Sequence, residues 1–155
     1  MPESSEDPRV RVAPLAEIPA ETLYGILRLR VDVFVVEQAC AYPELDGRDL
    51  EPDARQLWIE DASGVAATLR LLDDGTALRI GRVVAHPRVR GGGAAAALMR
   101  RALAEAAGRE IVLDAQAPLA DWYGRFGFAP CGDEFLEDGI PHVPMRRPAA
   151  QAQGS

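Results

Sequence analysis

The chain has 155 residues, of which 48% are hydrophobic and 26% are charged, and it carries a formal net charge of −7. This composition predicts one soluble globular domain, because two cores in so short a chain would each be small. No apolar run approaches the about 20 residues that span a bilayer, and the acidic start of the chain lacks the apolar stretch of a secretory signal. Nucleic acid is not an expected partner, since duplex binding needs a cationic face.

Several residue types are rare or absent, which excludes some chemistries. All 17 basic residues are arginine, so the chain has no lysine for a Schiff base or a P-loop. Cys40 and Cys131 form no C-x-x-C pair, and the two histidines, His86 and His142, add no zinc-site spacing, so no metal is expected. The simplest setting for such cysteines is the reduced cytoplasm. A serine hydrolase is nearly excluded, because the chain lacks G-x-S-x-G.

The first third of the chain predicts a strand, a helix and a long loop. Residues 1–8 are expected to form a disordered leader, and residues 9–12 a short strand. An apolar stripe with near-3.6 spacing predicts a helix that begins after Pro19 and fades near Glu37. Residues 39–55, several of which are acidic, predict an irregular loop with one helical turn. Loops of this length are often functional.

The rest of the chain alternates strands and helices. Three strands are predicted over residues 56–62, 65–72 and 78–85, then a helix over 94–107 and a buried strand over 110–115. Pro118 opens a short helix through residue 126, a hairpin turns at residues 137–139, and residues 148–155 predict a disordered tail. This order predicts a single α+β domain over residues 9–147 with a mixed, mostly antiparallel sheet flanked by helices.

The most informative segment runs from Arg90 through Gly91, Gly92 and Gly93 directly into the predicted helix. Glycines allow a turn in which backbone N–H groups point inward, and a helix N-terminus favours an anion. Arg88 and Arg90 add positive charge to an otherwise acidic chain. The segment therefore predicts a cradle for a phosphate or pyrophosphate, rather than only a flexible helix cap.

One interpretation of this cradle is a dinucleotide site. Gly91-x-Gly93-x-x-Ala96 fits the fingerprint, and Asp114 lies about 20 residues further on, where a ribose-binding acid is expected. However, five residues including Pro87 separate the loop from its strand, and too little chain follows Asp114 to complete a doubly wound sheet. A small nicotinamide-nucleotide-binding protein is thus the less favoured interpretation.

A second interpretation comes from a resemblance. Arg90-x-x-Gly93-x-Ala95 resembles the R/Q-x-x-G-x-G/A signature of the GNAT acetyltransferases, and Trp122-Tyr123-x-x-Phe126-Gly127-Phe128 resembles the Y-x-x-x-G-F segment of that family. Segments at residues 33–49, 115–117 and 137–142 resemble its ElaA-type subgroup. The resemblance covers residues 10–147 and implies the GNAT (acyl-CoA N-acyltransferase) fold and an acetyl-CoA-dependent N-acetyltransferase.

The resemblance also implies how the donor is bound. Arg90 stands at the first position of the signature. The CoA pyrophosphate would lie on the backbone N–H groups of the loop, which are those of Gly91, Gly92, Gly93, Ala94 and Ala95. The pantetheine arm would pair with the backbone of the preceding strand, at Val83, Val84 and Ala85. Packing in the core alone would also explain the side chains of Val83 and Val84.

The implied reaction is direct attack of a primary amine on the thioester, with the oxyanion held by a backbone N–H near Val84. Tyr123 would be the general acid for the leaving thiolate, although packing alone would also explain an aromatic residue there. The glutamate that many GNAT enzymes place before the loop is absent from Arg82-Val83-Val84-Ala85. Glu37 and His142 remain as candidate bases or amine contacts, and His142 is equally compatible with a structural role.

The acceptor and partners stay open at this point. The loop acids Glu44, Asp46, Asp49, Glu51 and Asp53 could attract a cationic amine, or the outer ones could simply be solvated. Cys40 is interpreted as a packing residue. The expected acceptor is a small-molecule or protein amine, with no membrane partner, and a homodimer stays open. The alternative to an enzyme is a non-catalytic acyl-CoA-binding or sensing module.

Overall fold

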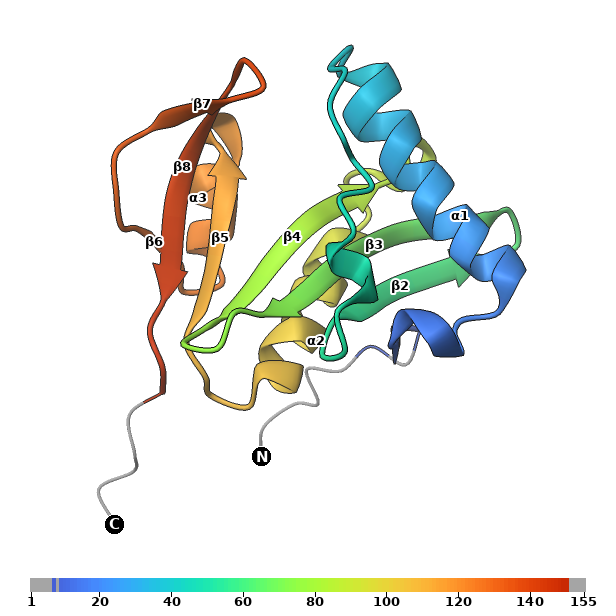
Figure 1. Cartoon of the computed structure of the whole chain (residues 1–155), viewed down its shortest axis with the longest axis horizontal. Coiled ribbons are helices and arrows are strands. Elements are labelled where there is room, and N and C mark those ends of the chain that lie inside the picture. Colours follow the sequence, from blue (N-terminus) through green and yellow to red (C-terminus); the bar gives the residue numbers. More distant parts are fainter. Residues whose placement is uncertain (1–6, 8, 151–155) are drawn as a thin grey trace.

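The computed structural model describes Asp7 and residues 9–150 (Figure 1). The predicted leader over residues 1–8 and the predicted tail over 148–155 lie mostly outside these described residues. Within them, eight strands form one sheet in the order β1-β2-β3-β4-β5-β8-β6, and β7 also pairs with β8. The strands are β1 (Arg11–Ala13), β2 (Arg55–Asp61), β3 (Gly64–Asp73), β4 (Leu78–Ala85), β5 (Ile111–Gln116), β6 (Ala129–Pro130), β7 (Phe135–Glu137) and β8 (Ile140–Arg147).

The helices cover both faces of this sheet. Helix α1 (Ala20–Val31) lies over one face, and α2 (Ala94–Ala106) and α3 (Ala120–Gly124) lie over the other (Figure 1). Helix α1 continues as a π-helix, η2 (Asp32–Glu37), and 3₁₀ turns occur at η1 (Leu15–Glu17), η3 (Arg48–Leu50), η4 (Pro87–Val89) and η5 (Ala117–Leu119). No helix in the described part of the chain is long and apolar enough to cross a membrane.

The predicted elements are present, with three differences. The helix that ends near Glu37 finishes in π rather than α geometry, with Gln38 N–H donating to the Val33 carbonyl oxygen five residues back. Helix α3 is shorter than the predicted segment through residue 126, because the chain turns after Gly124. The sequence analysis did not predict β6, since a strand of two residues has no period to detect.

Two apolar cores hold the layers together. Strand β3 is buried on both faces, from Val65 to Leu72. On one face, α2 packs Leu98 and Met99 against the sheet, and on the other, α1 packs Ile26 and Leu29. Burying one such side chain contributes about 1.5–3 kcal/mol, so the two cores fix the helices that flank the central strands.

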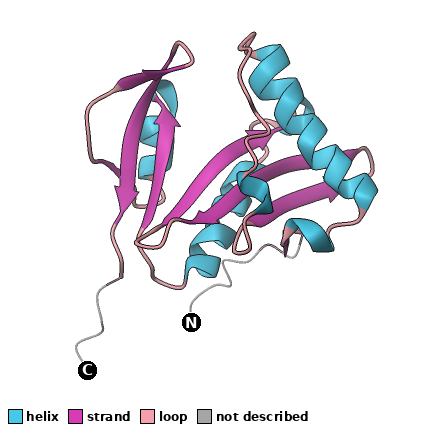
Figure 2. Ribbon diagram, viewed as in Figure 1, coloured by secondary structure: helices cyan, strands magenta, loops and turns pink. Residues whose placement is uncertain are grey.

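Strands β4 and β5 form the sole parallel pair among the described strands, and they separate almost at once. They pair at Leu78–Ile111 and Arg79–Val112, and Figure 2 shows them diverging beyond that point. Strand β4 contains a bulge at the same place: the four residues from Gly81 to Val84 face the three from Thr68 to Arg70, and Arg82 has a positive φ of 56°. A bulge bends its strand and increases its twist, which turns β4 away from β5.

A buried network of ion pairs fixes the acidic loop between η2 and β2. Arg30 of α1 is fully buried; its guanidinium donates to Glu44 at 2.7 Å and to Asp49 at 2.7 and 3.2 Å. Arg70 of β3 donates to Asp46 at 2.8 and 3.0 Å, and Arg82 pairs with Glu44 and Asp46. Removing one partner of a buried pair typically costs about 3–5 kcal/mol, so these contacts tie the loop to α1, β3 and β4.

This network corrects part of the sequence analysis. Glu44, Asp46 and Asp49 are neither free to attract an amine nor simply solvated, because arginines from three elements engage them. Glu51 pairs with Arg48 on the surface of the loop at 2.8 Å. Burial opposes ionisation of Asp46, but the hydrogen bonds from Arg70 and from the backbone of Arg48 outweigh it and lower the pKa of Asp46 to about 2.

The pKa of Asp46 generates a prediction for acid stability. Its pKa falls from 3.8 to about 2 on folding, so the carboxylate stabilises the fold above about pH 4, and this contribution is lost as the pH falls toward 2. We expect Asp46→Asn to lower the free energy of unfolding at pH 7 by on the order of 1–2 kcal/mol, and the difference from wild type to shrink at pH 3. Urea unfolding at both pH values measures it. Asp53→Asn, in the same loop, is the matched control; equal effects of the two variants would contradict the prediction.

Candidate active site

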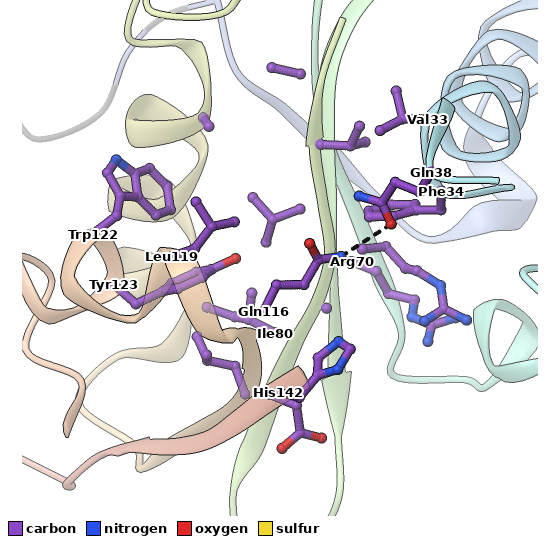
Figure 3. Close-up of a pocket in the computed structure, with 18 of the residues that line it drawn as sticks. Val33, Phe34, Gln38, Arg70, Ile80, Gln116, Leu119, Trp122, Tyr123 and His142 are labelled. Atoms are coloured by element: carbon purple, nitrogen blue, oxygen red, sulfur yellow. Dashed lines mark hydrogen bonds between the residues drawn. The ribbon is translucent and has the colours of Figure 1, made fainter. Parts of the chain in front are cut away.

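A cleft of about 750 Å³ opens where β4 and β5 separate (Figure 3). One wall comes from β4 and η2, and the other comes from β5, β8 and α3. Because each strand lacks a partner on its cleft side beyond Arg79 and Val112 in the described chain, backbone N–H and C=O groups along both edges are available to a ligand. The cleft therefore combines apolar side chains with hydrogen-bonding backbone.

The β4 wall carries the three residues predicted to bind the pantetheine arm. Val83, Val84 and Ala85 all line the cleft. The side chain of Val84 is buried in the α1 core, as the purely structural interpretation of this residue requires. The two interpretations are compatible, because a strand can pack its side chains into the core while its edge faces a ligand.

The glycine loop forms one end of the cleft. Gly91 and Gly93 adopt positive φ values of 84° and 87°, which favour glycine, and α2 begins directly after Gly93. Gly91, Gly93, Ala94 and Ala95 line the cleft. The first N–H groups of an α-helix have no partner within the helix, so this end presents donors suited to an anion.

Gly92 differs from its neighbours in the loop. Its N–H donates to the Val89 carbonyl oxygen at 3.1 Å, and it does not line the cleft. A Cβ at Gly92 would lie 3.1 Å from that same oxygen. The turn itself therefore uses this donor, so the structure favours its neighbours over Gly92 for the predicted anion contact.

Arg90 and Glu37 form a strut between the glycine loop and η2. The guanidinium of Arg90 donates to both carboxylate oxygens of Glu37, at 2.7 and 2.9 Å, and to the Ala85 carbonyl oxygen at 3.0 Å. The hydrogen bond from Arg90 lowers the pKa of Glu37, whose side chain is exposed and does not line the cleft. Glu37 is thus badly placed and weakly basic for proton abstraction, and the charge of Arg90 is already neutralised.

Tyr123 of α3 directs its hydroxyl into the cleft (Figure 3). The residue is 7% exposed, and its ring packs edge-on against Trp122 and Phe128 at centroid distances of 4.9 and 6.4 Å. Burial raises the pKa of Tyr123 to about 12. Within the described residues its hydroxyl has no hydrogen-bond partner, so packing accounts for the ring but not for the oxygen.

His142 of β8 lies on the same wall, opposite Gln116 in the strand register. It is 9% exposed and stacks on Phe135 with a centroid distance of 5.8 Å. Its Nδ1 lies 2.7 Å from the Ile140 carbonyl oxygen. A neutral ring held in this way donates from Nδ1 and leaves Nε2 as an acceptor, and the residue lines the cleft.

The structure also reveals a contact that the sequence analysis missed. Gln116 Nε2 donates to Gln38 Oε1 at 3.2 Å across the cleft (Figure 3). Gln38 follows η2, and Gln116 ends β5, so this bond joins the two walls. Both residues lie in segments that resemble the ElaA-type subgroup, and this was the one available signal for their importance.

The acids that line the cleft are not those of the loop. Glu137, the last residue of β7, and Asp138, in the turn to β8, line its mouth and have no arginine partner in the described chain. Asp114 also lines the cleft and lies 3.4 Å from Arg79. Asp114 does not mark a dinucleotide site, because the mostly antiparallel sheet lacks the doubly wound parallel topology that such a site requires.

Comparisons with known proteins agree with this architecture. A family model described as an acetyltransferase (GNAT) domain matches residues 28–148. A UPF0039 protein of Mycobacterium tuberculosis is 49% identical over 139 residues, which are 86% of this chain and 89% of that protein.

Two crystal structures match with a TM-score of 0.84 over 89% of this chain and 98% of theirs. One is an acyl-CoA N-acyltransferase from Pseudomonas aeruginosa, 41% identical, and the other is Escherichia coli ElaA, 34% identical. The chain therefore belongs to the GNAT family of acyl-CoA-dependent acyltransferases and to its ElaA-type subgroup.

Proposed function

We propose that this protein is an N-acetyltransferase that moves the acetyl group of acetyl-CoA to a primary amine. The observation that carries the proposal is the hydroxyl of Tyr123, which is unpartnered and opens into the same cleft as the free edge of β4. Because no protein group in the described chain engages this hydroxyl, it is available to donate a hydrogen bond to a ligand in the cleft. The acyl-CoA N-acyltransferase of Pseudomonas aeruginosa supports the same class of reaction.

Donor binding uses the backbone of β4 and of the glycine loop. The pyrophosphate of CoA lies on the N–H groups of Gly91, Gly93, Ala94 and Ala95. The pantetheine arm extends along Val83, Val84 and Ala85 and pairs with that edge as an added strand would. The signature residue Arg90 acts indirectly, through its bonds to Glu37 and Ala85, and holds the loop in place.

In the proposed reaction, negative charge develops first on the thioester oxygen and then on the departing sulfur. The neutral amine attacks the thioester carbon, a backbone N–H near Val84 holds the oxyanion, and the C–S bond breaks as the carbonyl reforms. Tyr123 stays protonated at neutral pH because its pKa is about 12, so it can donate a hydrogen bond to the departing thiolate. The proton lost by the attacking nitrogen balances the one that the sulfur gains.

His142 is the better candidate for the base. Its ring lines the cleft, and Nε2 has no hydrogen-bond partner in the described chain, whereas Glu37 lies outside the cleft lining and pairs with Arg90. The unpaired carboxylates of Glu137 and Asp138 at the mouth favour a cationic acceptor, which supports an amine.

The first experiment is calorimetric titration of the purified full-length chain with acetyl-CoA, with NADH as the control. We expect micromolar binding of acetyl-CoA and none of NADH. A panel of primary amines, with release of the CoA thiol as the signal, then tests turnover. Acetyl-CoA binding without turnover on any amine would favour a non-catalytic acyl-CoA-binding module, and failure to bind would contradict the proposal.

Tyr123→Phe tests the role of the hydroxyl. We expect kcat to fall roughly 10²- to 10⁴-fold, the range for loss of an acid–base group, while the KM for acetyl-CoA changes little. Phenylalanine keeps the packing against Trp122 and Phe128, so the thermal midpoint should stay within a few degrees. An unchanged kcat would reduce Tyr123 to a packing residue.

His142→Gln and Glu37→Gln separate the two candidate bases. We expect His142→Gln to lower kcat. Glu37→Gln should leave kcat near that of the wild type and raise the KM for acetyl-CoA, because it breaks the strut that holds Arg90 and the glycine loop. The reverse pattern would make Glu37 the base.

A further inference from the structure

One end of the cleft is not used by the proposed donor contacts. The glycine loop leads into α2, which lies with α3 on one face of the sheet (Figure 1). The chain beyond α1 and η2 instead meets the β7–β8 turn, where Cys40 Sγ lies 3.5 Å from the Asp138 carbonyl oxygen. Cys40, Glu137, Asp138 and His142 all line the cleft, and we call the part that they line the acceptor end.

The register of the β7–β8 hairpin places two groups of the acceptor end on one face. Phe135 pairs with His142, and Glu137 pairs with Ile140. The stacking of Phe135 on His142 at a centroid distance of 5.8 Å shows that these two side chains share a face. Side chains two residues apart along a strand also share a face, so Glu137 lies on the same face as His142 and about 7 Å further along the hairpin.

His142 offers one hydrogen-bond acceptor to a ligand at this end. The residue is only 9% exposed, and its Nδ1 is held by the Ile140 carbonyl oxygen at 2.7 Å. Its Nε2 has no partner among the described residues, and the residue lines the cleft. This nitrogen is therefore available to accept a hydrogen bond from a donor such as an amine N–H.

The charges at the acceptor end favour a cation and disfavour a carboxylate. Four of the five arginines that line the cleft have a carboxylate partner within 3.3 Å: Arg70, Arg79, Arg82 and Arg90. The fifth, Arg125, has no such partner in the described chain, but it follows α3 on the α2 face of the sheet. The side-chain carboxylates of Glu137 and Asp138 have no partner among the described residues, so their negative charge remains available to a ligand.

We propose that the acceptor is a linear aliphatic diamine, with one amine at Nε2 of His142 and the other at the carboxylates of Glu137 and Asp138. This assignment rests on the proposed function, because it takes acetylation of an amine as the reaction. The separation of the two nitrogens in an extended putrescine molecule is comparable to the separation of the His142 and Glu137 positions along the hairpin. The cleft would thus bind both ends of such a molecule at once.

Only one of the two amines reacts. The amine at His142 is neutral when it attacks, and its nitrogen bonds to the acetyl carbon as the C–S bond breaks. One proton leaves this nitrogen, and one proton joins the CoA thiolate, so the products are the monoacetylated diamine and CoA. The second amine remains an ammonium and donates charge-assisted hydrogen bonds to Glu137 and Asp138.

Steady-state kinetics with putrescine and butylamine test the proposal, because the two molecules have the same carbon chain and differ by one amine. We expect kcat/KM of the wild type to be roughly tenfold higher for putrescine, as expected for a hydrogen bond to a charged group. Added salt should reduce this preference, since it screens exposed charges. Ornithine, which is putrescine with an added carboxylate, should be a poorer acceptor than putrescine.

Glu137→Gln and Asp138→Asn test where the second ammonium binds. We expect each variant to lower the ratio of the putrescine and butylamine kcat/KM values about twofold to fivefold, the range for loss of an exposed ion pair. Asparagine tolerates the positive φ of 51° at Asp138, so this variant removes charge without adding backbone strain. Glu134→Gln, an exposed neighbour outside the cleft lining, is the matched control and should keep the wild-type ratio.

Three outcomes would contradict the assignment, and they differ in what they leave intact. If the wild type acetylates another amine but does not prefer putrescine to butylamine, the diamine assignment is overturned and the proposed function stands. The same holds if the preference survives in the Glu137→Gln/Asp138→Asn double variant, because the second ammonium would then bind elsewhere. Failure of the wild type to acetylate any amine would overturn both the assignment and the proposed function.

Discussion

The separation of β4 and β5 is the constraint on which the site depends. Two strands of a sheet normally satisfy each other's backbone groups along their whole length, yet this parallel pair lasts for only two registered positions in the described chain. The bulge at Arg82 turns β4 away and leaves both edges open. A cleft with unpaired backbone at its centre follows directly, and the glycine loop at the end of β4 adds donors from the start of α2.

A sheet opened in this way must be held by other contacts, and charged side chains provide them on the α1 side. Arg30, Arg70 and Arg82 engage Glu44, Asp46 and Asp49, so the irregular loop is anchored at three points rather than one. Each of these charged side chains is buried or half-buried, and without an ion-pair partner it would destabilise the fold. The same pairing neutralises two of the arginines that line the cleft, and the strut between Arg90 and Glu37 neutralises a third. The charge that the cleft offers to a ligand therefore depends on which of its arginines already form ion pairs within the fold.

Sequence reasoning located the glycine loop, which lines the cleft, because the backbone freedom of glycines before a helix is a property of the residue itself. That this loop binds an anion stays a prediction. Sequence reasoning performed less well for groups that a partner within the fold already engages. Gly92 resembles its neighbours in sequence, but its N–H closes a turn. Glu37 and the loop acids carry the right charge for an amine, but arginines 53 and 24 positions away from Glu37 and Asp46 engage them.

The sequence by itself determined the order of elements, the mixed sheet, the glycine loop and the family, since periodicity, turn residues and short motifs are local along the chain. Only the tertiary structure decided which of these residues share the cleft. It brought Tyr123, His142, Gln38 and Gln116 together from four separate elements, and it left Arg125 without a partner. Pairing between distant charges depends on strand register, bulge position and helix packing, and no local pattern encodes these.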